Sequence, residues 1–264
     1  MFPSLIEFPG WIPIIGGAAL HTYGLLVAAG FFAGMLWVKH ESERVGIDAQ
    51  KMMDLFFYVV LSAIIGSRVF YVIASIPEWW KDPLVFFRFW EGGLVFYGGL
   101  IAAVVVGVWY GKKHHLSFLT VADTFSPGVA LGHVFGRFGC FFAGCCYGRE
   151  TPPDFPLSVL FPQTKYSIAP YDHRVYPTQL FEAAGELAIF AFLFFFRKRK
   201  KFEGEVFLLY IILYPVLRSV IEIYRGDGTR NFVIPGVLSA AQLISILWVC
   251  IAAVIWVRVR GKKA

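Results

Sequence analysis

The sequence predicts an all-α polytopic membrane protein with about seven transmembrane helices. Its 264 residues are 58% hydrophobic and 18% aromatic but only 16% charged, whereas charged residues make up about a quarter of an average soluble domain. Apolar stretches recur along the chain at close to the roughly 20 residues that a helix needs to cross a bilayer. Eight tryptophans and twelve tyrosines suit the two membrane interfaces. We therefore expect residues 1–264 to form a single integral membrane domain.

The predicted helices follow the apolar runs in chain order. Several contain glycine or proline, which membrane helices tolerate where neighbouring helices satisfy the backbone. The runs cover residues 17–38, 53–75, 94–110, 118–136, 178–196, 205–223 and 236–257. The connection between the fourth and fifth helices, residues 137–176, is long for a loop without structure of its own. Its aromatic residues favour a small ordered cap over the membrane.

Lysine and arginine gather in short clusters between the apolar runs. Because they form no basic face or domain, we interpret the net charge of +6 as an orientation signal and expect no nucleic-acid partner. Alternate connections and the C-terminal tail hold most of these residues: Lys39, Arg44, Lys51, Lys112, Lys113, 197–201 and 258–263. Cytoplasmic loops are enriched in them. The predicted N-terminus and the 137–176 cap therefore lie outside, and the C-terminus lies in the cytoplasm.

The stretch GRFGCFFAGCCYGR, residues 136–149, places two arginines among glycines and aromatic residues where the fourth apolar run ends. An arginine at membrane depth costs about 2.5–3.5 kcal/mol or more unless it lines a polar cavity or meets an anion. Arg137 and Arg149 carry fork-shaped donors that suit a phosphate. The stretch is therefore either an anion site for a lipid headgroup or a re-entrant loop whose arginines cap helix ends or extend to water.

Three of the four cysteines, Cys140, Cys145 and Cys146, lie in this stretch, and Cys250 lies far from it. No second cysteine pair and no nearby histidine pair completes the usual four-ligand zinc set. We therefore expect no metal site and no cofactor. A disulfide between Cys140 and one of the following pair, small polarizable packing, and a reactive thiol are the three interpretations of the cluster.

Two further stretches place charge beside or inside apolar runs: YPTQLFE at residues 176–182 and RSVIEIYR at residues 218–225. Together with residues 136–149, they resemble the bacterial prolipoprotein diacylglyceryl transferase family. That family carries a glycine-arginine-rich signature, a proline-glutamine-glutamate turn and an arginine-glutamate pair on a late helix, in this order. The resemblance extends from Tyr23 to Gln242, and three separated motifs in order make it specific.

The resemblance implies an enzyme of the bacterial inner membrane that moves a diacylglyceryl group from phosphatidylglycerol to the lipobox cysteine thiol of a prolipoprotein signal peptide. The products would be a thioether and glycerol phosphate, in the first step of lipoprotein maturation. This displacement needs donors for the growing phosphate charge, a base for the thiol and apolar room for two acyl chains. The implied partners are phosphatidylglycerol, the prolipoprotein and the bilayer.

Residue by residue, the resemblance assigns Arg137 and Arg218 to the phosphate. Glu222 follows Arg218 by four residues and shares its helical face, so it is either an ion-pair partner that orients Arg218 or a proton acceptor. The other matching positions are expected to contact the phospholipid or to form hydrogen bonds near it: Tyr23, Arg68, Gly139, Cys140, Gly148, Gln179, Glu182, Arg225 and Gln242.

The identity of the thiol-activating base is open. Tyr97 stands where many family members carry histidine, and tyrosine ionises far above neutral pH. Cys140 stands where many carry asparagine. His133 is a candidate replacement, because it precedes Arg137 by four residues on the same helical face and histidine titrates near neutrality. A packing role for His133 is the alternative.

Two other functions are compatible with the same arginines. A phospholipid-binding transporter would hold the headgroup without breaking a bond, and inverted repeats, which favour a transporter, are not visible in the sequence. A catalytically silent relative would explain Tyr97 and Cys140.

Overall fold

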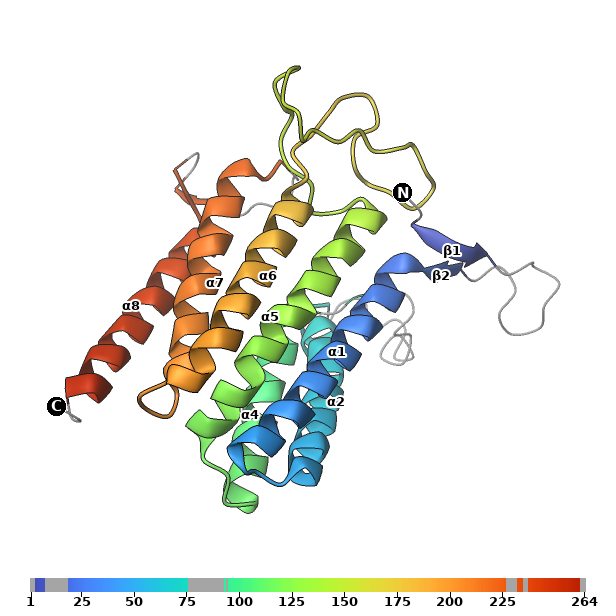
Figure 1. The fold of residues 1–264 in the computed structure, drawn as a ribbon. Helices are drawn as coiled ribbons and strands as arrows, with labels where there is room; N and C mark the ends of the chain where they lie inside the picture. Colours follow the sequence, from blue (N-terminus) through green and yellow to red (C-terminus); the bar gives the residue numbers. More distant parts are fainter. Residues whose placement is uncertain are drawn as a thin grey trace. The chain divides into compact units, whose positions relative to one another are not determined.

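The computed structural model describes residues 3–7, 19–75, 93, 95–226, 232–234 and 237–261. Helices dominate these residues, which confirms the predicted all-α class (Figure 1). The long helices are α1 (Thr22–Val45), α2 (Ala49–Ala74), α4 (Phe96–Lys113), α5 (Phe118–Ala143), α6 (Thr178–Phe196), α7 (Glu205–Tyr224) and α8 (Ala240–Gly261). A 3-10 turn, η3 (Arg197–Arg199), follows α6. Among the described helices, α1, α2, α6, α7 and α8 are long and apolar enough to cross a membrane, and for α4 and α5 a membrane crossing remains a prediction.

Two helix boundaries differ from the sequence-based expectation in ways that matter for the site. The helix predicted to end at residue 136 continues to Ala143, so the first half of the glycine-arginine stretch is helical. The first helix continues through Lys39 and Arg44, which were expected in a connection, and ends at Val45. There Nε of Arg44 donates to Glu41 Oε2 at 2.9 Å, a spacing of three residues that supports a last helical turn.

Two short antiparallel strand pairs were not predicted. β1 (Ser4–Glu7) pairs with β2 (Ala19–His21), and β3 (Phe232–Ile234) pairs with β4 (Leu238–Ser239). β2 leads directly into α1 and β4 leads directly into α8. The two helices therefore begin at residues 22 and 240, later than the apolar runs alone indicated.

The chain divides into two compact units. The first contains Met1–Gly34 and Phe125–Ala264. In it the start of α1 packs on α5 where Gly30 meets Gly132, since a Cβ on Gly30 would lie 3.0 Å from the Gly132 carbonyl oxygen. Helices α5, α6 and α7 share a core of Ala130, Ile189, Leu193, Val206 and Tyr210. The residues that pack α7 on α8 include Phe202, Leu208 and Ala252.

The second unit contains Met35–Thr124. Its helices α2 and α4 approach closely at two glycines, because a Cβ on Gly66 would lie 2.6 Å from the Gly98 carbonyl oxygen. Asp48 caps α2 by accepting the backbone N–H of Gln50 at 2.9 Å, which satisfies a donor that the first helical turn leaves open. Trp37 Nε1 donates to the Thr124 carbonyl at 3.0 Å.

Residues 144–177 connect α5 to α6 and contain no helix or strand of their own. They nevertheless have a small core in which Phe161, Ala169 and Val175 are buried against Phe141 and Tyr147. Backbone N–H groups of residues 159 and 175 donate to each other's carbonyls at 3.1 and 2.9 Å. The segment therefore holds its shape through packing and backbone bonds, and its position outside the membrane remains a prediction.

Candidate functional site

Two polar side-chain pairs join α5 to α6 in the first unit. On α5, His133 and Arg137 lie one helical turn apart, and on α6 the same spacing separates Glu182 and Glu186. Arg137 Nη2 lies 3.0 Å from Glu182 Oε1, and His133 Nδ1 lies 2.9 Å from Glu186 Oε1. Both glutamates are almost completely buried. Because a buried carboxylate is costly without a partner, these pairs fix how the two helices face each other.

The surroundings of His133 include two tyrosines of α7. The Tyr210 hydroxyl lies 3.1 Å from His133 Nδ1, and the Tyr214 ring centroid lies 5.1 Å from that of the imidazole. If Nδ1 donates its proton to Glu186, Nε2 becomes the basic nitrogen of the ring. The His133 side chain is 34% exposed while that of Glu186 is 1% exposed, so the histidine can meet another molecule and the glutamate cannot.

Sequence reasoning placed His133 on the face of Arg137 but missed Glu186 and Tyr210. The available signal was the four-residue spacing of Glu182 and Glu186 on one apolar helix, which repeats the spacing of His133 and Arg137. That signal indicates two acidic groups on one face, although it does not say which helix that face meets.

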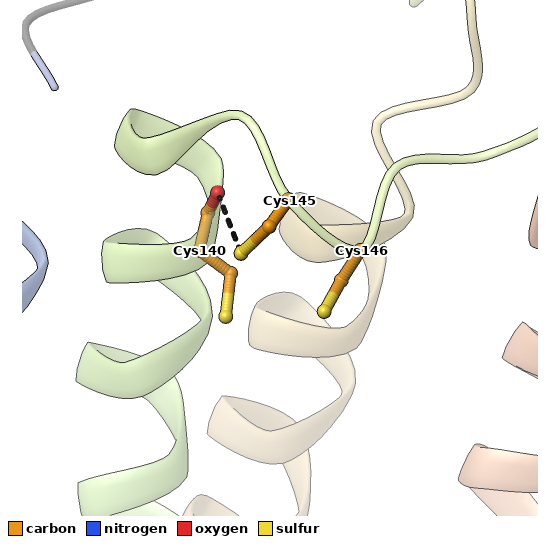
Figure 2. Close-up of side chains that lie close together, drawn as sticks. All are labelled: Cys140, Cys145 and Cys146. Carbon is orange, nitrogen blue, oxygen red and sulfur yellow. Dashed lines mark hydrogen bonds between the residues drawn. The ribbon is translucent and has the colours of Figure 1, made fainter. Parts of the chain in front are cut away.

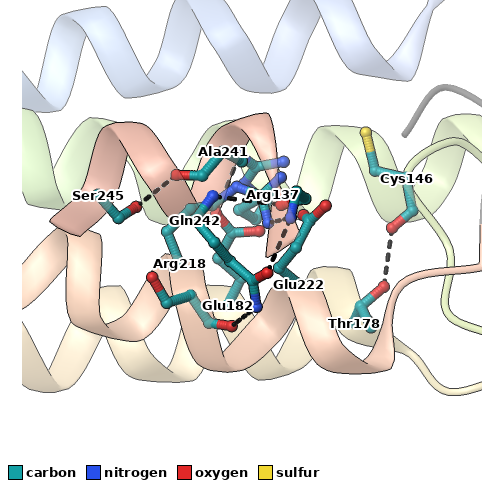
Figure 3. Close-up of polar contacts among 11 residues, drawn as sticks. Arg137, Cys146, Thr178, Glu182, Arg218, Glu222, Ala241, Gln242 and Ser245 are labelled. Atoms are coloured by element: carbon teal, nitrogen blue, oxygen red, sulfur yellow. Dashed lines mark hydrogen bonds and ion pairs between the residues drawn. The ribbon is translucent and has the colours of Figure 1, made fainter. Parts of the chain in front are cut away.

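The second arginine forms its pair within α7. Arg218 Nη1 lies 2.8 Å from Glu222 Oε2, as their helical spacing predicts, and Glu222 is buried. Tyr214, one turn before Arg218, interacts electrostatically with Arg137, Glu182 and Arg218. Figure 3 shows both arginines with their glutamates in one group of polar side chains. The structure thus brings Arg137 and Arg218, predicted from separate motifs, into one polar cluster.

Gln242 belongs to the start of α8 and supports the backbone there. Its Oε1 accepts the N–H of Ser239 at 3.1 Å, and Ser239 Oγ accepts the N–H of Gln242 at 3.2 Å. This reciprocal pair is a capping box. Gln242 Nε2 also donates to the Ser219 carbonyl of α7 at 3.5 Å, directly after Arg218. Gln242 therefore ties the beginning of α8 to the arginine-bearing turn of α7.

The second half of the glycine-arginine stretch is bonded to the start of α6. Thr178 Oγ1 donates to the Cys146 carbonyl at 2.8 Å, and Gln179 Nε2 donates to the Cys145 carbonyl at 2.7 Å. The N–H of Gly148 donates to the Tyr176 carbonyl at 2.9 Å. Gln179 thus supports the loop through its amide, and its contact with the phospholipid remains a prediction.

Gly148 and its neighbours also meet the end of α7. A Cβ on Gly148 would lie 2.6 Å from the Tyr176 carbonyl oxygen and 2.9 Å from that of Tyr224, so no larger residue fits without a shift. Arg149 donates its N–H to the Tyr224 carbonyl at 2.8 Å and places its guanidinium over the Tyr224 ring. Arg225 forms an isolated antiparallel bridge with Gly148. Three segments distant in sequence therefore meet at this glycine.

Tyr23 and Gly139 are in contact. A Cβ on Gly139 would lie 3.0 Å from Tyr23 Cδ2, so the glycine admits the tyrosine ring against α5. Tyr23 remains 45% exposed. Cys140 follows Arg137 by three residues and lies in the last turn of α5.

Two predicted site residues, Arg68 and Tyr97, belong to the second unit. Arg68 is buried, donates from Nη1 to the Gly93 carbonyl at 3.1 Å and lies over the Tyr71 ring at 5.1 Å. Tyr97 lies in the first turn of α4 and is 54% exposed. Arg68 thus has a structural task, which is to hold the backbone just before α4. Its use as a third anion ligand remains a prediction.

Comparison with known proteins gives a consistent result over nearly the whole chain. A family model described as prolipoprotein diacylglyceryl transferase matches residues 9–258. Phosphatidylglycerol–prolipoprotein diacylglyceryl transferase 2 of Clostridium perfringens is 33% identical over 233 residues, 88% of each chain. The phosphatidylglycerol–prolipoprotein diacylglyceryl transferase of Finegoldia magna is 34% identical over 250 residues. That of Legionella pneumophila (strain Paris) is 32% identical over 262 residues. The Finegoldia match covers 94% of each chain. The Legionella match covers 96% of this chain and 98% of the relative.

Proposed function

This chain belongs to the prolipoprotein diacylglyceryl transferase family, and we propose that it transfers the diacylglyceryl group of phosphatidylglycerol to the lipobox cysteine of a prolipoprotein. It is a multi-pass membrane protein with several apolar helices. We place it in the cytoplasmic membrane of a bacterium, with its N-terminus outside, on the distribution of lysine and arginine. That orientation would place residues 144–177 on the outer face.

The reaction is a displacement at a glycerol carbon. The cysteine sulfur forms a bond to that carbon, and the bond between the carbon and the phosphate oxygen breaks. The electron pair of the broken bond stays on the phosphate, which leaves as glycerol phosphate, and the thiol proton passes to a base. The enzyme must therefore stabilise negative charge on a phosphate and accept one proton.

Arg137 and Arg218 are the groups that we assign to the phosphate. The observation that carries this assignment is the meeting of two largely buried arginines, from α5 and α7, in one polar cluster. A guanidinium has five N–H donors, so pairing with one carboxylate orients it and leaves donors to share with a phosphate. Their bonds would strengthen as the leaving group gains charge.

His133 is the base that we assign to the thiol. It is partly exposed and its Nδ1 is held by Glu186, so Nε2 can take the thiol proton. The cluster of Arg137, Arg218 and their neighbours holds two guanidiniums against the three carboxylates of Glu182, Glu186 and Glu222. Proton uptake by His133 would add a positive charge to this cluster while the leaving phosphate becomes more negative, which favours the transition state.

The test is a transfer assay with the purified protein in vesicles that contain phosphatidylglycerol. A synthetic signal peptide with a lipobox cysteine should gain the mass of a diacylglyceryl group while glycerol phosphate is released. Arg137→Ala and Arg218→Ala should each lose roughly 100- to 1,000-fold in rate, by comparison with other oxyanion donors. Lysine should restore little, because it lacks the planar fork.

Arg199→Ala is the matched control, since Arg199 is an exposed arginine of η3 and should not affect the rate. The serine version of the peptide should gain no mass. Full turnover per folded molecule in Arg137→Ala would contradict the phosphate assignment. Absence of the thioether product with the folded wild-type protein would contradict the proposed activity itself.

A further inference from the structure

The three cysteines of the glycine-arginine stretch converge although they come from a helix end and the following loop. Their Sγ atoms all lie within 4.8 Å of one another, as Figure 2 shows. Cys140 belongs to the last turn of α5, and Cys145 and Cys146 follow in the loop. All three are free thiols and each is partly exposed.

The backbone turn that brings the sulfurs together is well determined by local interactions. Gly144 has a φ of +69°, and Cys146 has a φ of +59°, a left-handed conformation that is uncommon for a residue with a side chain. The N–H of Cys145 donates to the Cys140 carbonyl at 3.1 Å. On α6, the side chains of Thr178 and Gln179 donate hydrogen bonds to the Cys146 and Cys145 carbonyls, respectively. The loop is therefore fixed from both sides in the shape that gathers the thiols.

The spacing of the sulfurs fits a metal ion of the zinc class. Zinc–thiolate bonds of about 2.3 Å in a tetrahedral arrangement place the sulfurs about 3.8 Å apart, a separation that small side-chain rotations can reach from the observed cluster. Three protein ligands are enough when a water or a substrate takes the fourth position. The expectation of no metal site rested on the missing fourth ligand, and that requirement applies only to closed sites.

Charge around the cluster also suits such an ion. Three thiolates carry three negative charges, so a divalent cation leaves one negative charge. Arg137 and Arg225 both place positive potential at Cys146, which favours its thiolate form over the thiol. Soft thiolate ligands select zinc-like cations over magnesium and calcium, which prefer oxygen.

We propose that Cys140, Cys145 and Cys146 bind one thiophilic cation of the zinc class, with a fourth coordination position open to solvent or to a thiol. The bound ion would clamp the end of α5 to the loop that Thr178 and Gln179 hold. The site adjoins the proposed phosphate site, since Arg137 acts on Cys146, but zinc binding is measured without the transfer reaction and can fail independently of it.

The test uses the full-length protein in detergent, reduced and then freed of metal with a chelator. Titration with zinc chloride against a chromophoric zinc chelator should show one zinc ion bound per chain. Serine at Cys140, Cys145 or Cys146 should weaken binding by more than the roughly 10- to 100-fold that loss of an outer-shell partner costs. Cys250→Ser is the control, because Cys250 lies on α8 and is exposed.

Thiol labelling of the unmutated protein keeps the test independent of any folding defect in the variants. Zinc should protect three of the four cysteines from alkylation and leave Cys250 reactive, whereas magnesium should protect none. Cobalt in place of zinc should produce thiolate-to-metal charge-transfer absorption. Equal zinc uptake by a variant with serine at all three positions would overturn the proposal. So would a disulfide between two of these cysteines that resists the reductant and prevents zinc binding.

Discussion

Glu186 Oε1 lies 2.9 Å from His133 Nδ1, although the two residues are 53 positions apart in the chain. One helical turn away, Arg137 forms the equivalent contact with Glu182. The shared geometry places a histidine and an arginine, each in contact with a buried glutamate, on the same face of α5. In the proposed reaction His133 accepts the thiol proton and Arg137 binds the phosphate.

The first prediction concerns this histidine pair. His133→Ala should lower the rate of diacylglyceryl transfer by roughly 100- to 10,000-fold, the range typical of general-base removal. Glu186→Gln keeps the shape but removes the charge that orients the ring, so it should lose less than His133→Ala. The measurement is the transfer rate as a function of pH for each folded variant. An unchanged rate in His133→Ala would exclude the histidine as the base.

The second prediction concerns Tyr97, the other candidate base. If the tyrosine only orients substrate through its hydroxyl, Tyr97→Phe should lose about 10-fold, corresponding to about 1.4 kcal/mol for one hydrogen bond. Tyr97→His should then bring no gain over the wild type. Transfer rates of the two variants, measured at the same protein concentration, provide the check. A loss in Tyr97→Phe as large as that in His133→Ala would point to tyrosine instead.

The third prediction concerns the stability of the pair on α7. Arg218→Ala removes one ion-pair partner of the buried Glu222, which should lower the free energy of unfolding by up to about 3–5 kcal/mol. Adding Glu222→Gln removes the buried charge and should recover part of the loss, because the two residues are coupled. Melting temperatures of the wild type, both single variants and the double variant measure this coupling. Additive losses in the double variant would argue against the pair.

The fourth prediction concerns close packing at Gly148. Gly148→Ala would place a Cβ 2.6 Å from a backbone oxygen of Tyr176, so it should cost about 1–3 kcal/mol of stability through overpacking. Gly136→Ala is the matched control, because no atom outside its own helix backbone lies within 4 Å of its ideal Cβ position. Thermal unfolding should therefore separate two identical substitutions twelve residues apart. Equal melting temperatures would show that the contact at Gly148 can relax freely.

The fifth prediction concerns orientation in the membrane. In a chain without its four native cysteines, Asp154→Cys should react with a membrane-impermeant maleimide in intact cells, and Arg199→Cys should not. Both positions are exposed on the protein, so a difference in labelling would report the side of the membrane. The opposite pattern would invert the proposed topology.

Much of the helical framework could be predicted because apolar length is a local property. The run predicted for residues 178–196 coincides with α6, and the prediction for 205–223 differs from α7 by one residue. The end of α5 was predicted too early, because Arg137 is a charged residue after an apolar run. Its charge is balanced by Glu182 on another helix, and no local pattern contains that information.

The site shows the same limit. The pairing of Arg218 with Glu222 could be predicted, because both lie on one face of one helix. The contact of His133 with Glu186 and the convergence of three sulfurs could not, because each depends on how separate segments meet. Helical periodicity gives the face of a side chain but not the identity of the neighbouring segment.

The bonds around Gly148 have a mechanical consequence. Backbone and side-chain hydrogen bonds connect the loop after α5 to the start of α6 and to the end of α7 at several points. Opening this junction would break several bonds at once, and such cooperative regions open rarely compared with singly attached loops. A lipid or peptide that enters and leaves with each turnover must therefore pass by way of other parts of the chain, because this junction stays closed. The junction would act as a fixed frame that keeps Arg137 and Arg218 aligned through each turnover.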